Sequence, residues 1–233
     1  MAAIVHWFTT AAHWHGPDGV PMRVLEHLEL SGLAMVAATA AAIPAGILLG
    51  HTRRGGLFAI SVVNIGRAIP SFAIVAVALP VSISLGLGLG FWPTFLAVFL
   101  LAVPPMFTNA YTAIGGVDPQ IVDAARGMGL RERELLVGVE LPLGAPVIMA
   151  AVRVAAVQVV ATVPLAALVG WGGLGRFIID GLAQYDMAQV FAGALLVAAL
   201  AILTEVGFGL LEHVVLPPGV RRLSRAEAAS TVV

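Results

Sequence analysis

The chain lacks cysteine and contains few charged residues. Without cysteine it can form no disulfide, no thiolate nucleophile and no cysteine-ligated zinc site. Charged residues make up 11% of the 233 residues and hydrophobic residues 60%, whereas a typical soluble domain carries about 25% charged residues. The net charge of −1 offers no basic surface for nucleic acid. The composition therefore predicts a protein that lies within a lipid bilayer.

Five apolar segments are long enough to cross a membrane, which takes about 20 residues at a rise of about 1.5 Å each. We expect an all-α, polytopic membrane protein. Its five transmembrane helices are predicted near residues 28–50, 57–79, 92–114, 151–169 and 188–211. They form a transmembrane domain over residues 28–213, flanked by an N-terminal tail, 1–27, and a C-terminal tail, 214–233.

The arginines indicate the orientation of these helices, because cytoplasmic loops of membrane proteins are enriched in basic residues. Three clusters follow the first, third and fifth predicted helices: Arg53 and Arg54; Arg126, Arg131 and Arg133; Arg221, Arg222 and Arg225. The opposite side has Arg23 and Arg176. We therefore expect the N-terminus outside and the C-terminus in the cytoplasm.

The remaining polar residues form no recognisable catalytic set. His6, His13 and His15 have no acidic or cysteine partner at metal-ligand spacing, so we expect a solvated tail there and no metal site. No stretch of about 100 residues remains for a nucleotide-hydrolysing domain. The chain alone is therefore not expected to be an enzyme.

The loop between the third and fourth predicted helices, residues 115–146, carries the clearest pattern. Asp118 and Pro119 are typical of a helix N-terminus. Apolar and charged residues then alternate at helical spacing, and Gly127-Met128-Gly129 predicts a turn before a second polar helix. Such a short amphipathic helix either docks in a groove of another protein or lies at the membrane surface. The pattern alone leaves both open.

The same loop contains Asp123-Ala124-Ala125, then Gly129, then Val139-Glu140-Leu141-Pro142. This spacing resembles the EAA loop of permease subunits of ATP-binding-cassette (ABC) importers. Asp123 stands where Glu is commoner, which keeps the charge on a shorter arm, and Val139 stands where Ile is commoner. Residues 64–71, 123–129, 139–143, 146–150, 160–162 and 168–175 are also similar to osmoprotectant permeases, so the resemblance covers most of the chain from about residue 57 to 180.

The resemblance implies a permease subunit in a bacterial inner membrane that imports a compatible solute such as glycine betaine, choline, carnitine or proline. It implies two ATPase subunits, a second permease chain, identical or paralogous, and an extracytoplasmic solute-binding protein. ATP and Mg²⁺ would bind to the ATPase, and this chain would bind no cofactor. The residues that would couple to the ATPase are Asp123, Ala124, Ala125, Arg126, Gly127, Gly129, Glu140, Leu141 and Pro142.

Three alternatives compete with this interpretation. A methionine-type ABC permease has the same five-helix plan. An ion-driven secondary transporter would show inverted internal repeats, and none is evident between the two halves of the sequence. A membrane scaffold gives no reason for the loop motif.

Several polar residues fall inside the apolar segments. Arg67 is costly in a membrane and therefore a candidate for the translocation pathway, beside a helix break at Pro70. A snorkelling arginine at a helix end is the alternative. The candidate pathway residues are Asn64, Arg67, Pro70, Ser71, Gln158 and Thr162, although hydrogen bonding between helices also explains the uncharged ones.

A glycine-rich segment, residues 170–175, follows the fourth predicted helix. Its GxGxxG-like pattern lacks the strand and helix of a soluble dinucleotide site, so that function is excluded. We expect a flexible outer loop that contacts the solute-binding protein or gates the exit, with a plain turn as the alternative. The residues concerned are Trp171, Gly172, Gly173 and Gly175.

Overall fold

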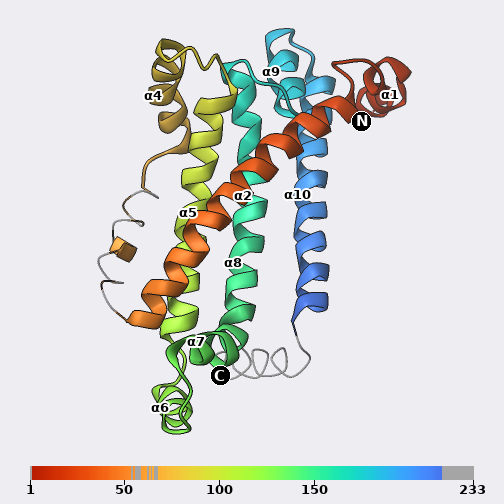
Figure 1. Cartoon of the computed structure of the whole chain (residues 1–233). Helices are drawn as coiled ribbons and strands as arrows, with labels where there is room; N and C mark the ends of the chain where they lie inside the picture. Colours follow the sequence, from red (N-terminus) through yellow and green to blue (C-terminus); the bar gives the residue numbers. More distant parts are fainter. Residues whose placement is uncertain are drawn as a thin grey trace. The chain divides into compact units, whose positions relative to one another are not determined.

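A computed structural model of the chain describes residues 2–53, 55, 59–61, 63, 65 and 68–216. Within these residues all regular structure is helical (Figure 1). The α-helices are α1 (Ala2–Thr9), α2 (Val20–Thr52), α4 (Ser71–Ser84), α5 (Phe91–Gly115), α6 (Pro119–Gly127), α7 (Glu132–Leu135), α8 (Leu141–Thr162), α9 (Gly175–Ala183) and α10 (Met187–Val215). The described part also contains two 3₁₀ segments, Ala11–Trp14 and Val163–Val169, and a π-helical turn, Leu136–Glu140.

Four helical stretches of the described chain are long and apolar enough to cross a membrane. They are Val20–Thr52, Phe91–Gly115, Glu132–Val169 and Met187–Val214. Helix α4 is apolar but shorter, and much of the segment before it lies outside the described residues. The all-α membrane fold is therefore confirmed, while the count of five transmembrane helices and their orientation stay predictions.

The chain divides into two compact units. Unit 1 contains Met1–Ala37, Arg67–Ala102 and Ala156–Glu205, and unit 2 contains Ala38–Gly66, Val103–Ala155 and Val206–Val233. The boundaries fall inside α2, α5, α8 and α10, so each of these long helices contributes to both units.

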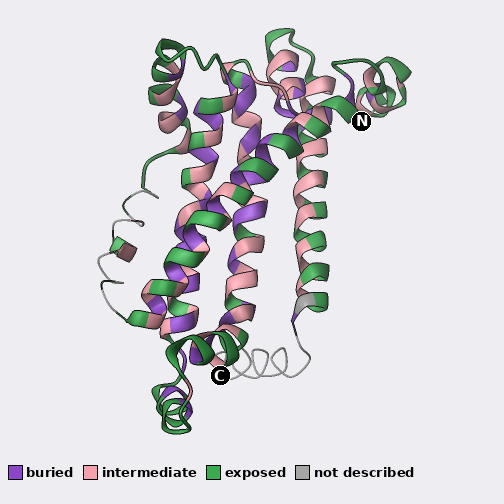
Figure 2. Ribbon diagram, in the orientation of Figure 1, coloured by how far each residue is buried: buried purple, intermediate pink, exposed green. Residues whose placement is uncertain are grey.

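In unit 2, α2 and α5 pack closely because glycines face the neighbouring backbone. A Cβ atom added at Gly46 would lie 2.6 Å from the Phe107 carbonyl oxygen, and one at Gly50 would lie 2.7 Å from that of Tyr111. Small residues let transmembrane helices approach in this way. Ala110 of α5, which a Cβ atom at Gly46 would also meet, is fully buried. Figure 2 shows buried residues along α5.

In unit 1, Trp7 of the N-terminal segment packs against α9, while His6 and His15 are exposed as a solvated tail predicts. Trp7 is 4% exposed, and its ring contacts Phe177 edge-on at 5.3 Å between centroids. His13 stacks on Trp7 at 4.3 Å and its ring Nδ1 lies 2.8 Å from the Trp7 carbonyl oxygen. The apolar run here is too short to span a membrane, yet it forms the two turns of α1, which bury the indole.

The helical stretch that contains the fourth predicted transmembrane segment begins well before that segment. Helical structure continues from Glu132 through the π-helical turn into α8, whereas the sequence predicted a start near Ala151. Gly138, Pro142 and Pro146 resemble helix breakers in the sequence. A π-helical turn absorbs an extra residue in the hydrogen-bond ladder, and membrane helices tolerate proline where their neighbours satisfy the freed groups.

Candidate functional site

The candidate site is the loop between α5 and α8, and its first helix begins as predicted. The Asp118 carboxylate accepts a hydrogen bond of 2.8 Å from the backbone N–H of Gln120. Pro119 is the first residue of α6, where its missing N–H would have no partner inside the helix. The N-terminus of α6 is therefore set by two local signals of the sequence.

One face of α6 is buried within the loop itself. Val122 and Ala125 are each 2% exposed and pack with Val117 and with Leu135 of α7. Ala125 therefore belongs to a small core that fixes α6 against α7. Among the candidate coupling residues, Asp123 and Ala124 lie on the exposed face instead.

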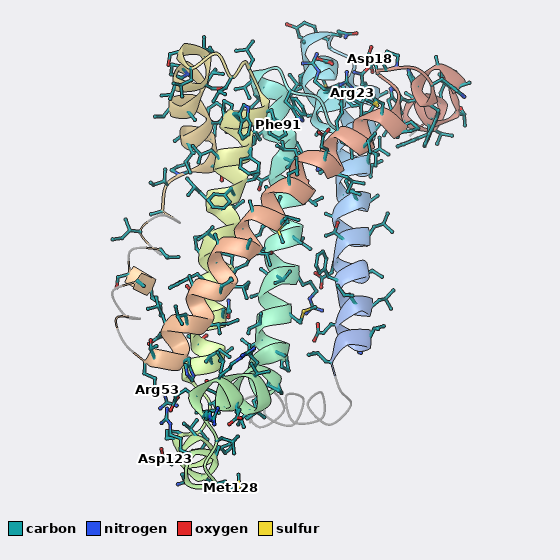
Figure 3. The ribbon with its side chains drawn as sticks, in the orientation of Figure 1. Asp18, Arg23, Arg53, Phe91, Asp123 and Met128 are labelled. Carbon is teal, nitrogen blue, oxygen red and sulfur yellow. The ribbon has the colours of Figure 1, made fainter. Side chains whose placement is uncertain are left out.

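The exposed face of α6 combines charge with apolar surface. Met128 is 75% exposed and Ile121 is 44% exposed, and Figure 3 shows Asp123 and Met128 at the far end of this loop. An exposed apolar patch with charged residues around it is typical of a protein-binding surface.

Arg126 joins α6 to α7. Its Nε and Nη2 atoms donate to the two carboxylate oxygens of Glu132 at 2.9 and 3.1 Å, and its Nη1 lies 4.0 Å from Asp123 Oδ1. The hydrogen bond from Arg126 to Glu132 raises the pKa of the arginine above its ordinary value, so its charge is fixed at any working pH. Because the pair is solvent-exposed, it contributes orientation more than stability.

The turn after α6 requires glycine at one position. Gly129 has φ +89°, in the left-handed region that residues with a Cβ atom rarely adopt. Its N–H donates to the Arg126 carbonyl oxygen at 2.9 Å, and the N–H of Leu130 donates to that of Ala125 at 3.2 Å. A Cβ atom at Gly127 or Gly129 would meet nothing within 4 Å. Conformation, not space, therefore requires Gly129.

The loop ends at Glu140, which the sequence motif included without indicating its environment. Glu140 is 1% exposed, and its carboxylate accepts a hydrogen bond from His51 Nδ1 of α2 at 2.5 Å. Leu141 and Pro142 follow as the first residues of α8. The sequence analysis did not select His51. A histidine at the end of the first apolar segment could have been noticed, but the sequence does not indicate that Glu140 is its partner.

The candidate pathway residues are only partly described. Asn64 and Arg67 lie outside the described residues. Pro70 immediately precedes α4, which starts at Ser71, and the Ile74 N–H donates to the Pro70 carbonyl oxygen at 3.1 Å. Pro70 itself has an extended backbone with ψ 132°, so α4 begins only after it, and the place of this break in a pathway stays a prediction.

The remaining two pathway candidates lie on α8 and are half-buried. Gln158 lies in the last turns of the helix and Thr162 is its final residue. No described contact joins them to Pro70 or Ser71, so their part in a pathway stays a prediction.

The glycine-rich segment after Val163–Val169 is closely packed in the structure, and its predicted flexibility stays a prediction. The Glu26 carboxylate accepts a 2.7 Å hydrogen bond from the Gly173 N–H. A Cβ atom at Gly172 would lie 2.0 Å from that carboxylate, and one at Gly175 would lie 2.3 Å from the Pro164 carbonyl oxygen. At both glycines the position of a missing side chain is filled by a neighbouring oxygen atom, from Glu26 at Gly172 and from Pro164 at Gly175. The role of the segment as a gate stays a prediction.

Trp171 also has a packed environment. Its ring contacts Phe91 of α5 at 5.0 Å between centroids, and a Cβ atom at Gly90 would lie 2.6 Å from the Trp171 backbone nitrogen. The segment is thus held by α2 on one side and by the start of α5 on the other.

An ion pair inside the transmembrane helices escaped the sequence analysis. Arg153 Nη1 of α8 lies 3.4 Å from Glu212 Oε2 of α10. Glu212 also borders a cavity of about 360 Å³, lined in addition by Asn109, Pro146, Val147, Ala150, Ala151 and Val154. The sequence does contain an indication of this pair, because Arg153 lies within an apolar segment, where a charged side chain is expected to have a partner.

Comparison with known proteins decides the family. Residues 42–216 match the model of the binding-protein-dependent transport system inner membrane component. The chain belongs to this family. The assignment confirms the resemblance carried by residues 123–142, and it places this permease as a multi-pass protein of a bacterial plasma membrane.

Curated relatives of the permease match over nearly their full lengths. It is 36% identical to a carnitine transport permease of Listeria monocytogenes, over 95% of this chain and 97% of the relative. It is 35% identical to a choline transport system permease of Bacillus subtilis, over 86% of this chain and 90% of the relative. An osmoprotectant import permease of Salmonella typhimurium is 32% identical, over 84% and 91% of the two chains.

A solved structure shows the same fold. The permease matches a chain of the inward-facing methionine ABC transporter MetNI with a TM-score of 0.72 and 21% identity, covering 85% of this chain and 96% of the other. At this identity the likeness concerns the fold alone. The permease is thus a membrane subunit of the ABC importer class, whose relatives are permeases and not ATPases.

Proposed function

We propose that this chain is the transmembrane subunit of an ATP-driven importer for quaternary-ammonium solutes such as glycine betaine, carnitine or choline, with proline as a further candidate. The similarity to permeases named for carnitine, choline and osmoprotectant transport supports this substrate class over methionine. The complete importer contains two ATPase subunits, a second permease chain and an extracytoplasmic solute-binding protein. ATP and Mg²⁺ bind to the ATPase subunits, and this chain needs no cofactor.

The observation that carries the proposal is the two-faced character of α6. Its inner face is fixed by Val122 and Ala125, and its outer face presents Asp123, Ala124 and Met128. A short helix that is rigid on one side and exposed on the other fits a groove of a partner protein. In the proposed importer that partner is the ATPase, on the cytoplasmic side of the membrane.

The mechanism we propose is mechanical. ATP-driven closure of the two ATPases moves the two α6 helices that they hold, and the transmembrane helices switch from inward-facing to outward-facing. In unit 2, close packing at Gly46 and Gly50 makes α2 and α5 move together. The buried contacts of Val122 and Ala125 keep α6 against α7 during this motion, and Arg126 orients α6 through Glu132.

The solute path is proposed to follow the polar residues of the apolar segments. The residues assigned to it are Asn64, Arg67, Pro70, Ser71, Gln158 and Thr162. The packed segment with Trp171, Gly172, Gly173 and Gly175 is proposed as the outer gate, anchored on Glu26. The alternative role of that segment is to contact the solute-binding protein.

Uptake measurements test the substrate class. The complete importer is reconstituted in proteoliposomes, and uptake of radiolabelled glycine betaine, carnitine, choline and proline is compared with that of methionine. We expect uptake of at least one of the first four to depend on ATP and on this chain. Uptake of methionine alone would contradict the substrate class, and uptake without ATP would contradict the importer.

A further inference from the structure

The C-terminal end of α2, together with Arg53 that follows it, contacts both ends of the loop between α5 and α8. Arg53 Nη2 donates to the Val117 carbonyl oxygen at 3.2 Å, where the chain leaves α5 for α6. His51 Nδ1 donates to Glu140 at 2.5 Å, where the chain enters α8. Residues 117 and 140 bracket α6 and α7, so His51 and Arg53, two positions apart at the end of α2, hold both ends of the loop. Figure 3 shows Arg53 at this end of α2.

His51 lies between two carboxylates. Its Nδ1 bonds Glu140, and its Nε2 lies 3.4 Å from Glu132 Oε2. The His51 side chain is 12% exposed and that of Glu140 is 1% exposed. A buried carboxylate without a hydrogen-bond donor is costly, and His51 supplies the donor. One ring nitrogen of His51 thus faces each of the two carboxylates.

The contacts continue from α2 to α6. Glu132 faces His51 on one side and accepts both hydrogen bonds from Arg126 on the other. Three successive polar contacts therefore lead from Glu140, through His51 and Glu132, to α6. The residue between the two anchors takes no part, because the Thr52 hydroxyl donates to the Leu48 carbonyl oxygen of its own helix at 2.9 Å.

We propose that His51 and Arg53 are positioning residues that tie the coupling loop to α2. With these ties in place, a displacement of α6 moves α2 with the loop; without them, the loop bends and the displacement is lost. The proposal rests on the coupling role proposed above for α6. It assigns to α2 a function that the loop motif does not contain, since both residues lie more than 60 positions earlier in the chain.

The first test measures solute transported per ATP hydrolysed in the reconstituted importer. The variants are His51→Ala and Arg53→Ala, with Thr52→Ala as the matched control in the same turn. We expect His51→Ala to lower transport per ATP about tenfold, within the usual range of coupling between sites, and Arg53→Ala to lower it less because it removes one bond to a carbonyl group. Thr52→Ala should match the unchanged importer. Unchanged transport per ATP in His51→Ala would overturn the proposal.

The second test measures the distance between α6 and α2, which the contacts of His51 should hold constant. The chain has no cysteine, so spin labels can be placed only where cysteines are introduced, at the exposed residues Gln120 of α6 and Leu48 of α2. We expect one narrow distance distribution, unchanged between the nucleotide-free and ATP-bound states. In His51→Ala the distribution should broaden or shift with nucleotide. A distribution identical to that of the unmodified His51 protein would overturn the proposal.

The two tests remain decisive if a variant fails to assemble. His51→Gln retains one N–H donor group and replaces His51→Ala in both measurements; we expect an intermediate loss, and no change would overturn the proposal. Failure of the ATPase to bind the wild-type chain would instead refute the proposed function. The widths of the label-distance distributions of the wild-type and His51→Ala chains, both measured without nucleotide, then still decide whether His51 holds the loop.

Discussion

The close packing of α2 on α5 predicts that Gly46→Ala destabilises the protein. The added Cβ atom would lie 2.6 Å from the Phe107 carbonyl oxygen and 2.8 Å from the Ala110 Cβ atom. Real Cβ contacts essentially never fall below 3.0 Å. Neither blocking atom belongs to a flexible side-chain end, so the two helices must separate locally.

The magnitude follows from two opposing effects. Overpacking a close contact costs about 1–3 kcal/mol, and replacing Gly by Ala in a helix recovers up to about 1 kcal/mol. Because the blocking atoms are fixed, we place the cost in the upper part of its range and expect a net loss of about 1–2 kcal/mol. For a chain of this length that loss lowers the midpoint of thermal unfolding by roughly 2–8 °C.

Gly32→Ala is the matched control on the same helix. A Cβ atom there meets nothing within 4 Å, so the variant should be neutral or slightly stabilised. Both variants are compared with the unmodified chain by thermal unfolding in one detergent. If Gly46→Ala unfolds at the same temperature as Gly32→Ala, the inferred contact between α2 and α5 is wrong.

Two further predictions concern the loops. Gly172→Ala should lower uptake and weaken the hydrogen bond between the Gly173 N–H and Glu26, because its Cβ atom would displace the carboxylate. Hydrogen exchange of the Gly173 amide measures this bond. Equal protection of that amide in the wild-type and variant proteins would refute the prediction. Gly129→Asp should leave the protein inserted in the membrane but abolish transport and binding of the ATPase. The substitution strains a backbone at φ +89° and adds a negative charge beside α6. Uptake at the wild-type rate would disprove the coupling role.

The local structure of the loop could be predicted from sequence because its signals are local. Asp118 and Pro119 act within one turn of the helix that they start, and Gly129 sets its own backbone. The hydrogen bond between His51 and Glu140 joins residues 89 positions apart. Helical periodicity predicts which residues share a face of one helix, but not which residues of another helix they contact. The motif therefore identified Glu140 without its partner.

Other differences arise where tertiary contacts override local preferences. The apolar residues around Trp7 are too few to indicate a membrane helix, yet they fold because Phe177 covers the indole. Gly172 and Gly175 are typical of a flexible loop in sequence, but in the structure they admit a carboxylate and a carbonyl group. In this segment the glycines therefore reflect close packing against neighbouring groups.

Cross-linking from α6 tests the central claim most directly. Ala124 is exposed on α6 and its neighbour Ala125 is 2% exposed, so Ala124→Cys and Ala125→Cys form a matched pair in a chain without other cysteines. Each variant is purified with its partner subunits and treated with a short thiol-to-amine cross-linker. The account predicts a cross-link to an ATPase subunit from Ala124→Cys and none from Ala125→Cys. A purified complex without an ATPase, or one in which Ala124→Cys never reaches it, would contradict the account.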